Sequence, residues 1–289
     1  NTTGTENVAV GYTSLDANTT GSYNTAVGTD SMSANTTGQE NVSVGWNSLD
    51  ANTTGNYNVA IGASALGVNT TAASNTAVGY GSLTANTTGT TNVAVGSTAM
   101  AANTTADNNT GIGAASMNGN TTGTRNTAVG SDSLKVNTTG NDNTAVGKGA
   151  LTANTTASNN TAVGKNALAA NTTGANNTAV GKSALDANTT GASNTVLGAD
   201  ALSADTQGSR SVAIGTSALE VQNFTTATNT YNVAVGFNAG AAISTGTLNT
   251  AVGGLSLDAT TTGSYNTAVG YSAGGAITTG ESNVCIGYN

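Results

Sequence analysis

The chain has 289 residues, with no histidine, no proline, one cysteine, only 7% charged residues and a formal net charge of −8. Surfaces that bind nucleic acid need clustered Lys and Arg against phosphate, so this charge balance argues against a nucleic-acid partner. No apolar run reaches the length of about 18 residues that a membrane helix needs, so we expect no membrane insertion in this segment.

The sequence repeats with a period of 17 residues along its whole length. Twelve regular units, each opening with Asn-Thr-Thr, span 1–204, and five variant units with an insertion near 222–225 span 205–289. The consensus is N-T-T-G-x-x-N-(T/V)-A-V-G-x-x-(A/S)-L-x-(A/V), whose positions we number one to seventeen. Because self-similarity at a fixed period is typical of repeat architectures, we expect one repeat domain over 1–289.

Each unit is expected to form one short strand at positions eight to ten, beginning with 8–10 and 25–27 and ending with 284–286. Position eight is β-branched, position nine is small, position ten is aliphatic and position eleven is always glycine. The density of Thr, Asn and Gly argues against helices. Identical strands at a fixed period predict an all-β parallel β-roll, a β-solenoid of stacked 17-residue coils.

Four positions are expected to face the interior of a coil: eight, ten, fifteen and seventeen. In the unit 171–187 these are Thr178, Val180, Leu185 and Ala187. With 17 coils at roughly 4.8 Å each, the stack would be about 80 Å long.

Position fifteen is Leu or Met in all units but two, where Gly240 and Gly274 occur. In both of these units an isoleucine follows three residues later, as Ile243 and Ile277. A hole in a packed interior costs a few kcal/mol, so each isoleucine is predicted to fill the space that the missing side chain leaves.

Positions seven, nine and fourteen form a second restricted set, of Asn at seven and small residues at nine and fourteen. This set predicts close packing against another chain, and hence an oligomer, most simply arranged around a threefold axis. Cys285 stands at position nine, where it either replaces Ala or forms an interchain bond. The expected inter-chain packing residues are Asn24, Ala26, Asn177, Ala179 and Cys285.

Two kinds of segment resemble known families. SRSVAIGTSAL (209–219) and NVAVGYTSL (7–15) are similar to head repeats of trimeric autotransporter adhesins, and NTAVGKNALAANTTGANNTAVGKSAL (160–185) is similar to repeats of bacteriophage tail fibres. The resemblance implies a left-handed roll with three intertwined chains, in a stalk or head that presents a receptor-binding tip. It also implies an extracellular location, on a virion or a bacterial cell surface. The adhesin repeats are usually shorter than this unit, and the self-cleaving chaperone domain common in such fibres does not occur within these residues.

Catalytic chemistry has no recurring basis in this sequence. There is no histidine, no close pair of acids recurs, and no base is placed to activate the many hydroxyl groups. The GGxGxD nonapeptide of calcium-binding rolls is missing. We therefore expect no enzyme activity, no cofactor and no metal site.

Two groups of side chains are candidate ligand contacts. Lys148, Lys165 and Lys182 follow the invariant glycine in successive units, so they form either a contact for anionic glycan or phosphate, or a solvated row balanced by Asp142 and Asp186. Ten of the eleven aromatic residues stand at position six or twelve. They either bind a host-surface glycan or receptor, or pack over bends or a neighbouring chain; the candidates are Tyr12, Trp46, Tyr80, Phe237 and Tyr271.

The sequence thus favours a mechanical function, as a rigid trimeric fibre shaft or adhesin segment that presents a receptor-binding tip. One alternative is a self-assembling extracellular filament, in which coil ends stack chain on chain. A further alternative is an ice- or glycan-binding solenoid, although adjacent threonines such as Thr2 and Thr3 do not form one flat array.

Overall fold

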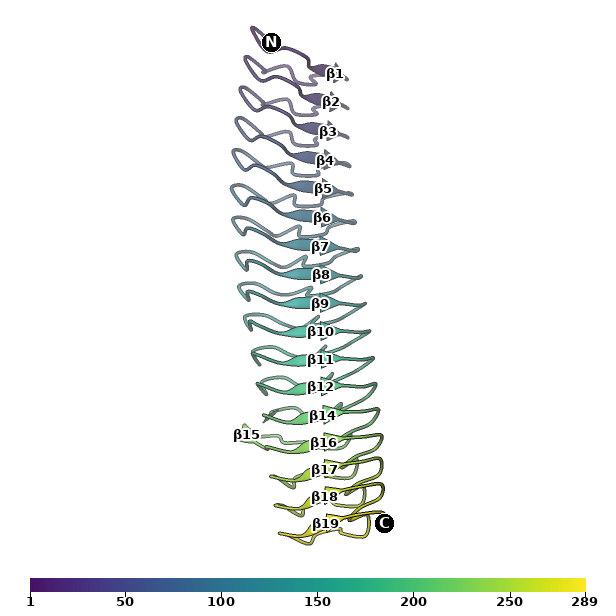
Figure 1. The fold of residues 1–289 in the computed structure, drawn as a ribbon. Helices are drawn as coiled ribbons and strands as arrows, with labels where there is room; N and C mark the ends of the chain where they lie inside the picture. Colours follow the sequence, from purple (N-terminus) through teal and green to yellow (C-terminus); the bar gives the residue numbers. More distant parts are fainter. The chain divides into compact units, whose positions relative to one another are not determined.

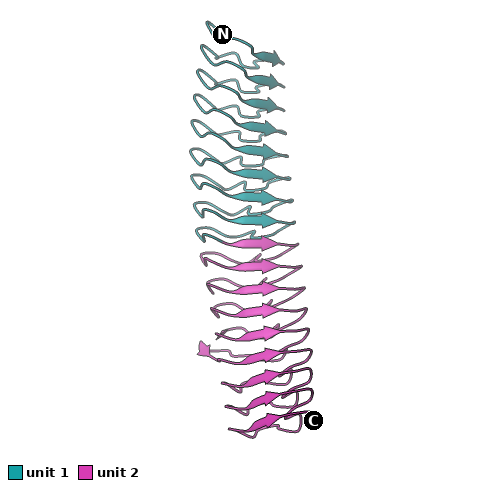
Figure 2. Ribbon diagram, viewed as in Figure 1, with its two compact units in different colours: residues 1–142 teal, residues 143–289 magenta.

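The computed structural model describes all residues, 1–289, and divides into two compact units, 1–142 and 143–289 (Figure 2). Neither unit contains a helix. In each unit every coil contributes one short strand, which pairs in parallel with the strand of the next coil (Figure 1). The chain is therefore an all-β parallel β-solenoid, as the repeat predicts.

The strands occur where the consensus places them, at positions eight to ten. The first unit contains β1 (Val8–Val10), β2 (Thr25–Val27), β3 (Val42–Val44), β4 (Val59–Ile61), β5 (Thr76–Val78), β6 (Val93–Val95), β7 (Thr110–Ile112) and β8 (Thr127–Val129). The second contains β9 (Thr144–Val146), β10 (Thr161–Val163), β11 (Thr178–Val180), β12 (Thr195–Leu197), β14 (Val212–Ile214), β16 (Val233–Val235), β17 (Thr250–Val252), β18 (Thr267–Val269) and β19 (Val284–Ile286). Each residue pairs with its own repeat equivalent, as Val8 does with Thr25.

The bends of each coil depend on left-handed backbone at positions six, thirteen and fifteen. Non-glycine residues at these positions have φ between 47° and 65° throughout the chain. Such a residue costs about 1–2 kcal/mol, so the neighbouring coils must hold it. They do so through main-chain hydrogen bonds: the Tyr23 N–H donates to the Thr5 carbonyl at 3.0 Å, and the Asp30 N–H donates to the Tyr12 carbonyl at 3.0 Å.

The invariant glycine at position eleven is required by both conformation and space. Gly181 has φ of 137°, and a Cβ there would lie 2.4 Å from the carbonyl oxygen of Gly198 in the next coil. No side chain fits this contact, which explains why the position never varies.

The interior of a coil is narrower than the sequence indicates. Buried side chains come from positions one, seven, nine, fourteen and fifteen. Leu185 is fully buried as predicted, but Thr178 is exposed and Val180 and Ala187 are half-exposed, so the inward assignment of positions eight, ten and seventeen is wrong. Leucine at fifteen fills the space opposite the strand, which leaves room for only a small side chain at nine.

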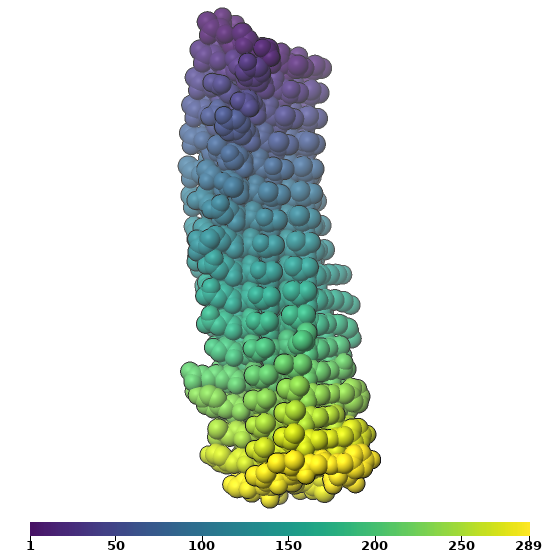
Figure 3. Space-filling view, viewed as in Figure 1, coloured from purple at the N-terminus to yellow at the C-terminus, as the bar shows by residue number.

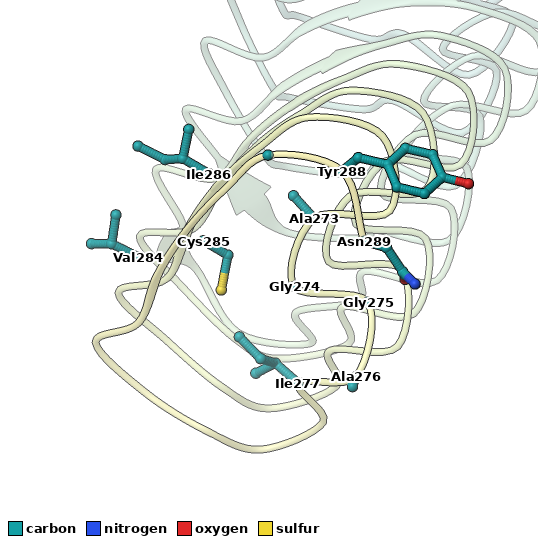
Figure 4. A pocket seen from close by; sticks show the side chains of 11 residues that line it. Ala273, Gly274, Gly275, Ala276, Ile277, Val284, Cys285, Ile286, Tyr288 and Asn289 are labelled. Carbon is teal, nitrogen blue, oxygen red and sulfur yellow. The ribbon is translucent and has the colours of Figure 1, made fainter.

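The residues predicted to pack between chains lie inside their own coil instead. Asn24, Ala26, Asn177 and Ala179 have no accessible surface within the single chain. They cannot contact another chain, so this prediction is wrong. Ala26 and Ala179 are small enough to fit the narrow interior. Cys285, at position nine of the last coil, points toward the same inner side (Figure 4).

Asparagine amides form two buried ladders along the stack. At position one, Asn35 Nδ2 donates to Asn18 Oδ1 at 2.9 Å, and Asn52 Nδ2 donates to Asn35 Oδ1 at 2.9 Å. At position seven, the Asn24 N–H donates to Asn7 Oδ1 at 2.9 Å, while Asn24 Nδ2 donates to the carbonyl of Gly38 at 2.9 Å. Because buried amides are costly unless paired, these ladders explain the asparagine at position one of the twelve regular units and at position seven.

The predicted compensation behind the two glycines at position fifteen is confirmed. Ile243 is buried, and its Cδ1 lies 2.9 Å from where a Cβ of Gly240 would stand. Ile277 Cδ1 lies 3.4 Å from the equivalent point at Gly274. Each isoleucine therefore occupies the space that leucine fills in other coils.

The insertion forms its own small element in the second unit, where β13 (Gly208–Ser209) pairs with β15 (Thr228–Asn229). Asp205 and Gln222 take the place of asparagine at position one, and Gln222 Nε2 donates to Asp205 Oδ2 at 2.6 Å. The Asp205 carboxylate also accepts the Phe224 N–H at 3.0 Å. The register of the main sheet resumes at β16, which pairs directly with β14.

Candidate functional site

The outer side of the strands, which we call the strand face, carries the exposed residues of positions six, eight and ten. Positions seven and nine between them point inward, so the burial pattern alternates across the strand. Within each unit, equivalent side chains stack in columns along the coils (Figure 3). The aromatic and lysine candidates named from the sequence all stand at position twelve, directly after the glycine that follows the strand.

Two columns of the strand face are aliphatic or β-branched. The most exposed members in the first unit include Val10, Ile61 and Ile112, and those in the second include Leu197 and Val269, each 39–58% accessible. Monomeric soluble proteins rarely expose contiguous apolar patches of this kind, so the pattern is typical of an interaction surface.

The ten aromatic residues at positions six and twelve are all exposed, with accessibilities from 44% to 80%. Their own chain covers them only in part, so ligand binding and packing over bends or a neighbouring chain both stay predictions. Their spacing has a regular component, because Tyr12, Trp46 and Tyr80 recur at every second coil at position twelve, and Tyr23 and Tyr57 do so at position six. Phe237 and Tyr271 keep the same interval in the second unit.

Steric crowding between aromatic rings does not impose the two-coil spacing. Tyr271 and Tyr288 occupy position twelve of consecutive coils and stack with centroids 5.7 Å apart. Neighbouring coils therefore accept neighbouring rings, and the alternation elsewhere is a property of the sequence.

The lysine candidates lie together in the second unit. Lys148, Lys165 and Lys182 are exposed at position twelve of successive coils. The Lys182 ammonium lies 3.9 Å from the Asp200 carboxylate. Asp142 does not balance this row, because its carboxylate forms a two-point ion pair with Arg125 at 2.7 and 2.9 Å.

Two carboxyl groups in these coils have shifted acidity. The hydrogen bond from Arg125 and its charge hold the pKa of Asp142 below its usual range. Burial raises the pKa of Asp186, and the Asp200 carboxylate adds to this effect. Neither carboxyl group with a shifted pKa is paired with a base that could exchange a proton with a substrate, so we assign no catalytic role to them.

A hollow of about 570 Å³ lies at the last coil (Figure 4). It is lined by interior residues of that coil, among them Cys285, Ile277 and Gly274. In the preceding coils the next coil covers these positions, so the hollow is the uncovered interior of the solenoid and not a ligand site.

A second hollow, of about 410 Å³, lies on the strand face between coils of the first unit. Its lining residues are Tyr23, Glu40 and Val42. Glu40 is not among the candidate contacts predicted from the sequence. A sequence pattern could have pointed to it, because glutamate and tyrosine alternate at position six in Glu6, Tyr23, Glu40 and Tyr57.

The threonine rows at the bend opposite the strand are partly used in the fold. At position two, Thr19 Oγ1 donates to the Thr36 carbonyl at 2.9 Å and Thr36 Oγ1 donates to the Thr53 carbonyl at 3.0 Å. In most coils position two is half-buried and position three is exposed, as Thr36 and Thr37 are, whereas both Thr70 and Thr71 are exposed. The rows therefore do not present a double array of free hydroxyl groups.

Comparison with known proteins assigns no family to this chain: no family model matches it, and no curated protein does. No set of three or more His, Cys, Asp or Glu side chains converges to hold a metal ion. None of its segments forms a helix with the length and apolar character needed to cross a membrane. The features that bear on function are therefore the solenoid and its strand face.

Proposed function

We propose that this chain is a structural segment of an extracellular fibre or adhesin, a trimeric shaft on a virion or cell surface that presents a receptor-binding tip. The observation that carries the proposal is the exposed aliphatic strand face on coils that are locked to one another by backbone and amide ladders. Such a scaffold resists local opening, because every coil is bonded to both neighbours.

The chain-to-chain contact is proposed to use positions eight and ten. These columns supply the apolar surface that positions seven and nine, being buried, do not. Side chains such as Ile112 would become buried when three chains bring their strand faces together. The resemblance of the repeats to tail-fibre and adhesin segments supports the number three.

The test replaces one column residue. Ile112→Lys puts a charge in the proposed interface, so light scattering should show wild type at three times the 27.8 kDa chain mass and the variant at lower mass. Thr105→Lys, on the exposed bend at position three, is the matched control and should leave the mass unchanged. A wild-type protein that is monomeric at micromolar concentration would contradict the assembly.

Electron micrographs of the same sample separate the shaft from a self-assembling filament. Discrete particles of uniform length support the shaft, whereas filaments of unlimited length would replace it with the filament.

A further inference from the structure

Position six in the first coils combines rings with carboxylates at a fixed interval. Tyr23 and Tyr57 stand two coils apart, with Glu40 in the coil between them, and all three side chains are exposed. Two strand spacings place the backbone positions of the two tyrosines roughly 9.6 Å apart. Glu40 therefore lies midway between two aromatic side chains.

The backbone that carries these side chains is fixed by the coil stack. The Tyr23, Glu40 and Tyr57 N–H groups donate to carbonyls of the preceding coil at 3.0, 3.1 and 3.1 Å. All three residues have left-handed φ, of 61°, 54° and 60°. The three side chains thus start from equivalent, ordered points, which limits the entropy lost on binding a ligand.

The space between them is open and negatively charged. The hollow on the strand face is lined by Tyr23, Glu40 and Val42, so it opens on the Tyr23 side of Glu40 and does not include Tyr57. No lysine or arginine pairs with Glu40, and the first 124 residues contain six acidic and no basic side chains. This region therefore attracts a cation that the chain itself does not supply.

The second unit shows what a cation does in this column. Arg210 and Tyr231 occupy position six of consecutive coils, and the Arg210 guanidinium carbon lies 5.5 Å from the centroid of the Tyr231 ring. Arg210 Nη1 also donates to the Tyr231 hydroxyl at 2.5 Å. A positive group one coil away from a position-six tyrosine thus lies within cation–π range, about 6 Å of the ring.

From this geometry we propose that Tyr23, Glu40 and Tyr57 form a binding site for a small quaternary ammonium ion of the choline type. The ammonium group of the ligand lies at the level of the Glu40 coil, one strand spacing (~4.8 Å) from the coil of each tyrosine. Glu40 compensates the charge, and Val42 contacts the methyl groups. One carboxylate between two rings does not provide the six or more oxygen ligands that a calcium ion takes. The site lies at the position-six margin of the strand face, and it requires that the proposed chain contact leave Val42, a position-eight residue, uncovered in these coils.

The chain contains a counterpart without the carboxylate, in which Arg210 already contacts one of the two rings. Tyr231 and Tyr265 are also two coils apart at position six, but Leu248 stands between them. The Leu248 and Tyr265 N–H groups donate to the preceding coil at 2.8 and 3.0 Å, as in the first unit. This trio has the rings without the carboxylate.

The experiment titrates choline chloride into the intact protein at constant ionic strength, using calorimetry or ligand-observed NMR. We expect one saturable site per chain, and at least tenfold weaker binding of 3,3-dimethylbutan-1-ol, the uncharged isostere of choline. Equal binding of the two compounds, or no saturable binding of choline, would overturn the proposal.

Variants assign the binding to these residues. Tyr57→Asn and Glu40→Gln should each weaken binding about fivefold, the equivalent of roughly 1 kcal/mol. Asn already stands at position six in other coils, as Asn108 and Asn159 do, so the fold accepts it. Tyr265→Asn is the matched control and should leave choline binding unchanged; an equal loss in both tyrosine variants contradicts the site.

A gain of function completes the test. Leu248→Glu combined with Arg210→Asn, which frees the Tyr231 ring, recreates the trio in the second unit and should raise the stoichiometry from one to two, whereas an unchanged stoichiometry counts against the proposed geometry. Phosphatidylcholine vesicles then distinguish the source of the ligand. Vesicle binding that Tyr57→Asn abolishes indicates a lipid headgroup, and binding of free choline alone indicates a soluble ligand; vesicle binding that survives this substitution contradicts the site.

Discussion

At the scale of single residues, the buried asparagine amides determine whether one coil accepts the next. Asn86 Nδ2 donates to Asn69 Oδ1 at 3.0 Å, and Asn86 Oδ1 accepts from Asn103 Nδ2 at 2.9 Å. Where the ladder is interrupted, a polar atom is left over: Asn188 Oδ1 has no partner, because the next coil has Asp205 in place of an amide donor. Asp205 is retained there because its carboxylate anchors the insertion.

The amide ladder gives the first prediction. Asn86→Ala should lower the free energy of unfolding by about 2–4 kcal/mol, since it leaves both an acceptor of Asn69 and a donor of Asn103 buried without a partner. Urea unfolding followed by circular dichroism measures this loss. Thr88→Ala, on the exposed bend of the same coil, should change stability by less than about 0.5 kcal/mol, and equal losses would refute the role of the ladder.

At the scale of the coil, the period and the strands could be predicted from sequence, but the inner and outer faces could not. Alternation shows that positions eight and ten share one side and nine the other, without saying which side is the interior. The apolar side chains at positions eight and ten made them the expected interior positions. Instead, the buried side chain beside Leu185 is Ala179.

The coil also explains why the candidate site was found only in part. Tyr12 and Trp46 were identified from their aromatic character alone. Glu40 was not, because a single exposed carboxylate has no sequence signature until the coils place it between Tyr23 and Tyr57. Its partners are each 17 residues away, and only the stacking brings them together.

The second prediction concerns the invariant glycine of each coil. Gly79→Ala should destabilise the protein by about 3 kcal/mol or more, because its Cβ would lie 2.6 Å from the Gly96 carbonyl oxygen. Gly81→Ser, two residues later, should cost about 1 kcal/mol or less, since only Thr98 Cγ2 approaches, at 3.9 Å, and other coils have serine there. Thermal and urea unfolding compare the pair, and similar losses would show that the close approach is not limiting.

At the scale of the whole molecule, each coil depends only on its immediate neighbours, so stability should be nearly a sum over coils and their interfaces. The strand pairings connect consecutive coils with an offset of one repeat and nothing else. A complete repeat is therefore removable in principle.

The third prediction follows from this modularity. Deleting 86–102, one full repeat of the first unit, should give a folded protein with an unchanged circular dichroism spectrum per residue. Deleting 86–101 leaves Ala102 as one extra residue before Asn103, a smaller insertion than the one near 222–225, after which β16 still pairs with β14. It should therefore lower stability at that bend without unfolding the following coils. Loss of the coils after 102 in limited proteolysis of either deletion variant would contradict the nearest-neighbour argument.

The amide ladders also have a direction. At position one, Asn18 and Asn35 each donate to the preceding coil, and at position seven the N–H groups of Asn24 and Asn41 do the same. A finished coil therefore presents acceptor oxygens to the residues that follow it. During synthesis on the ribosome, which releases the chain from its N-terminus, each completed coil would act as a template for the next, so the protein is suited to fold while it is being made.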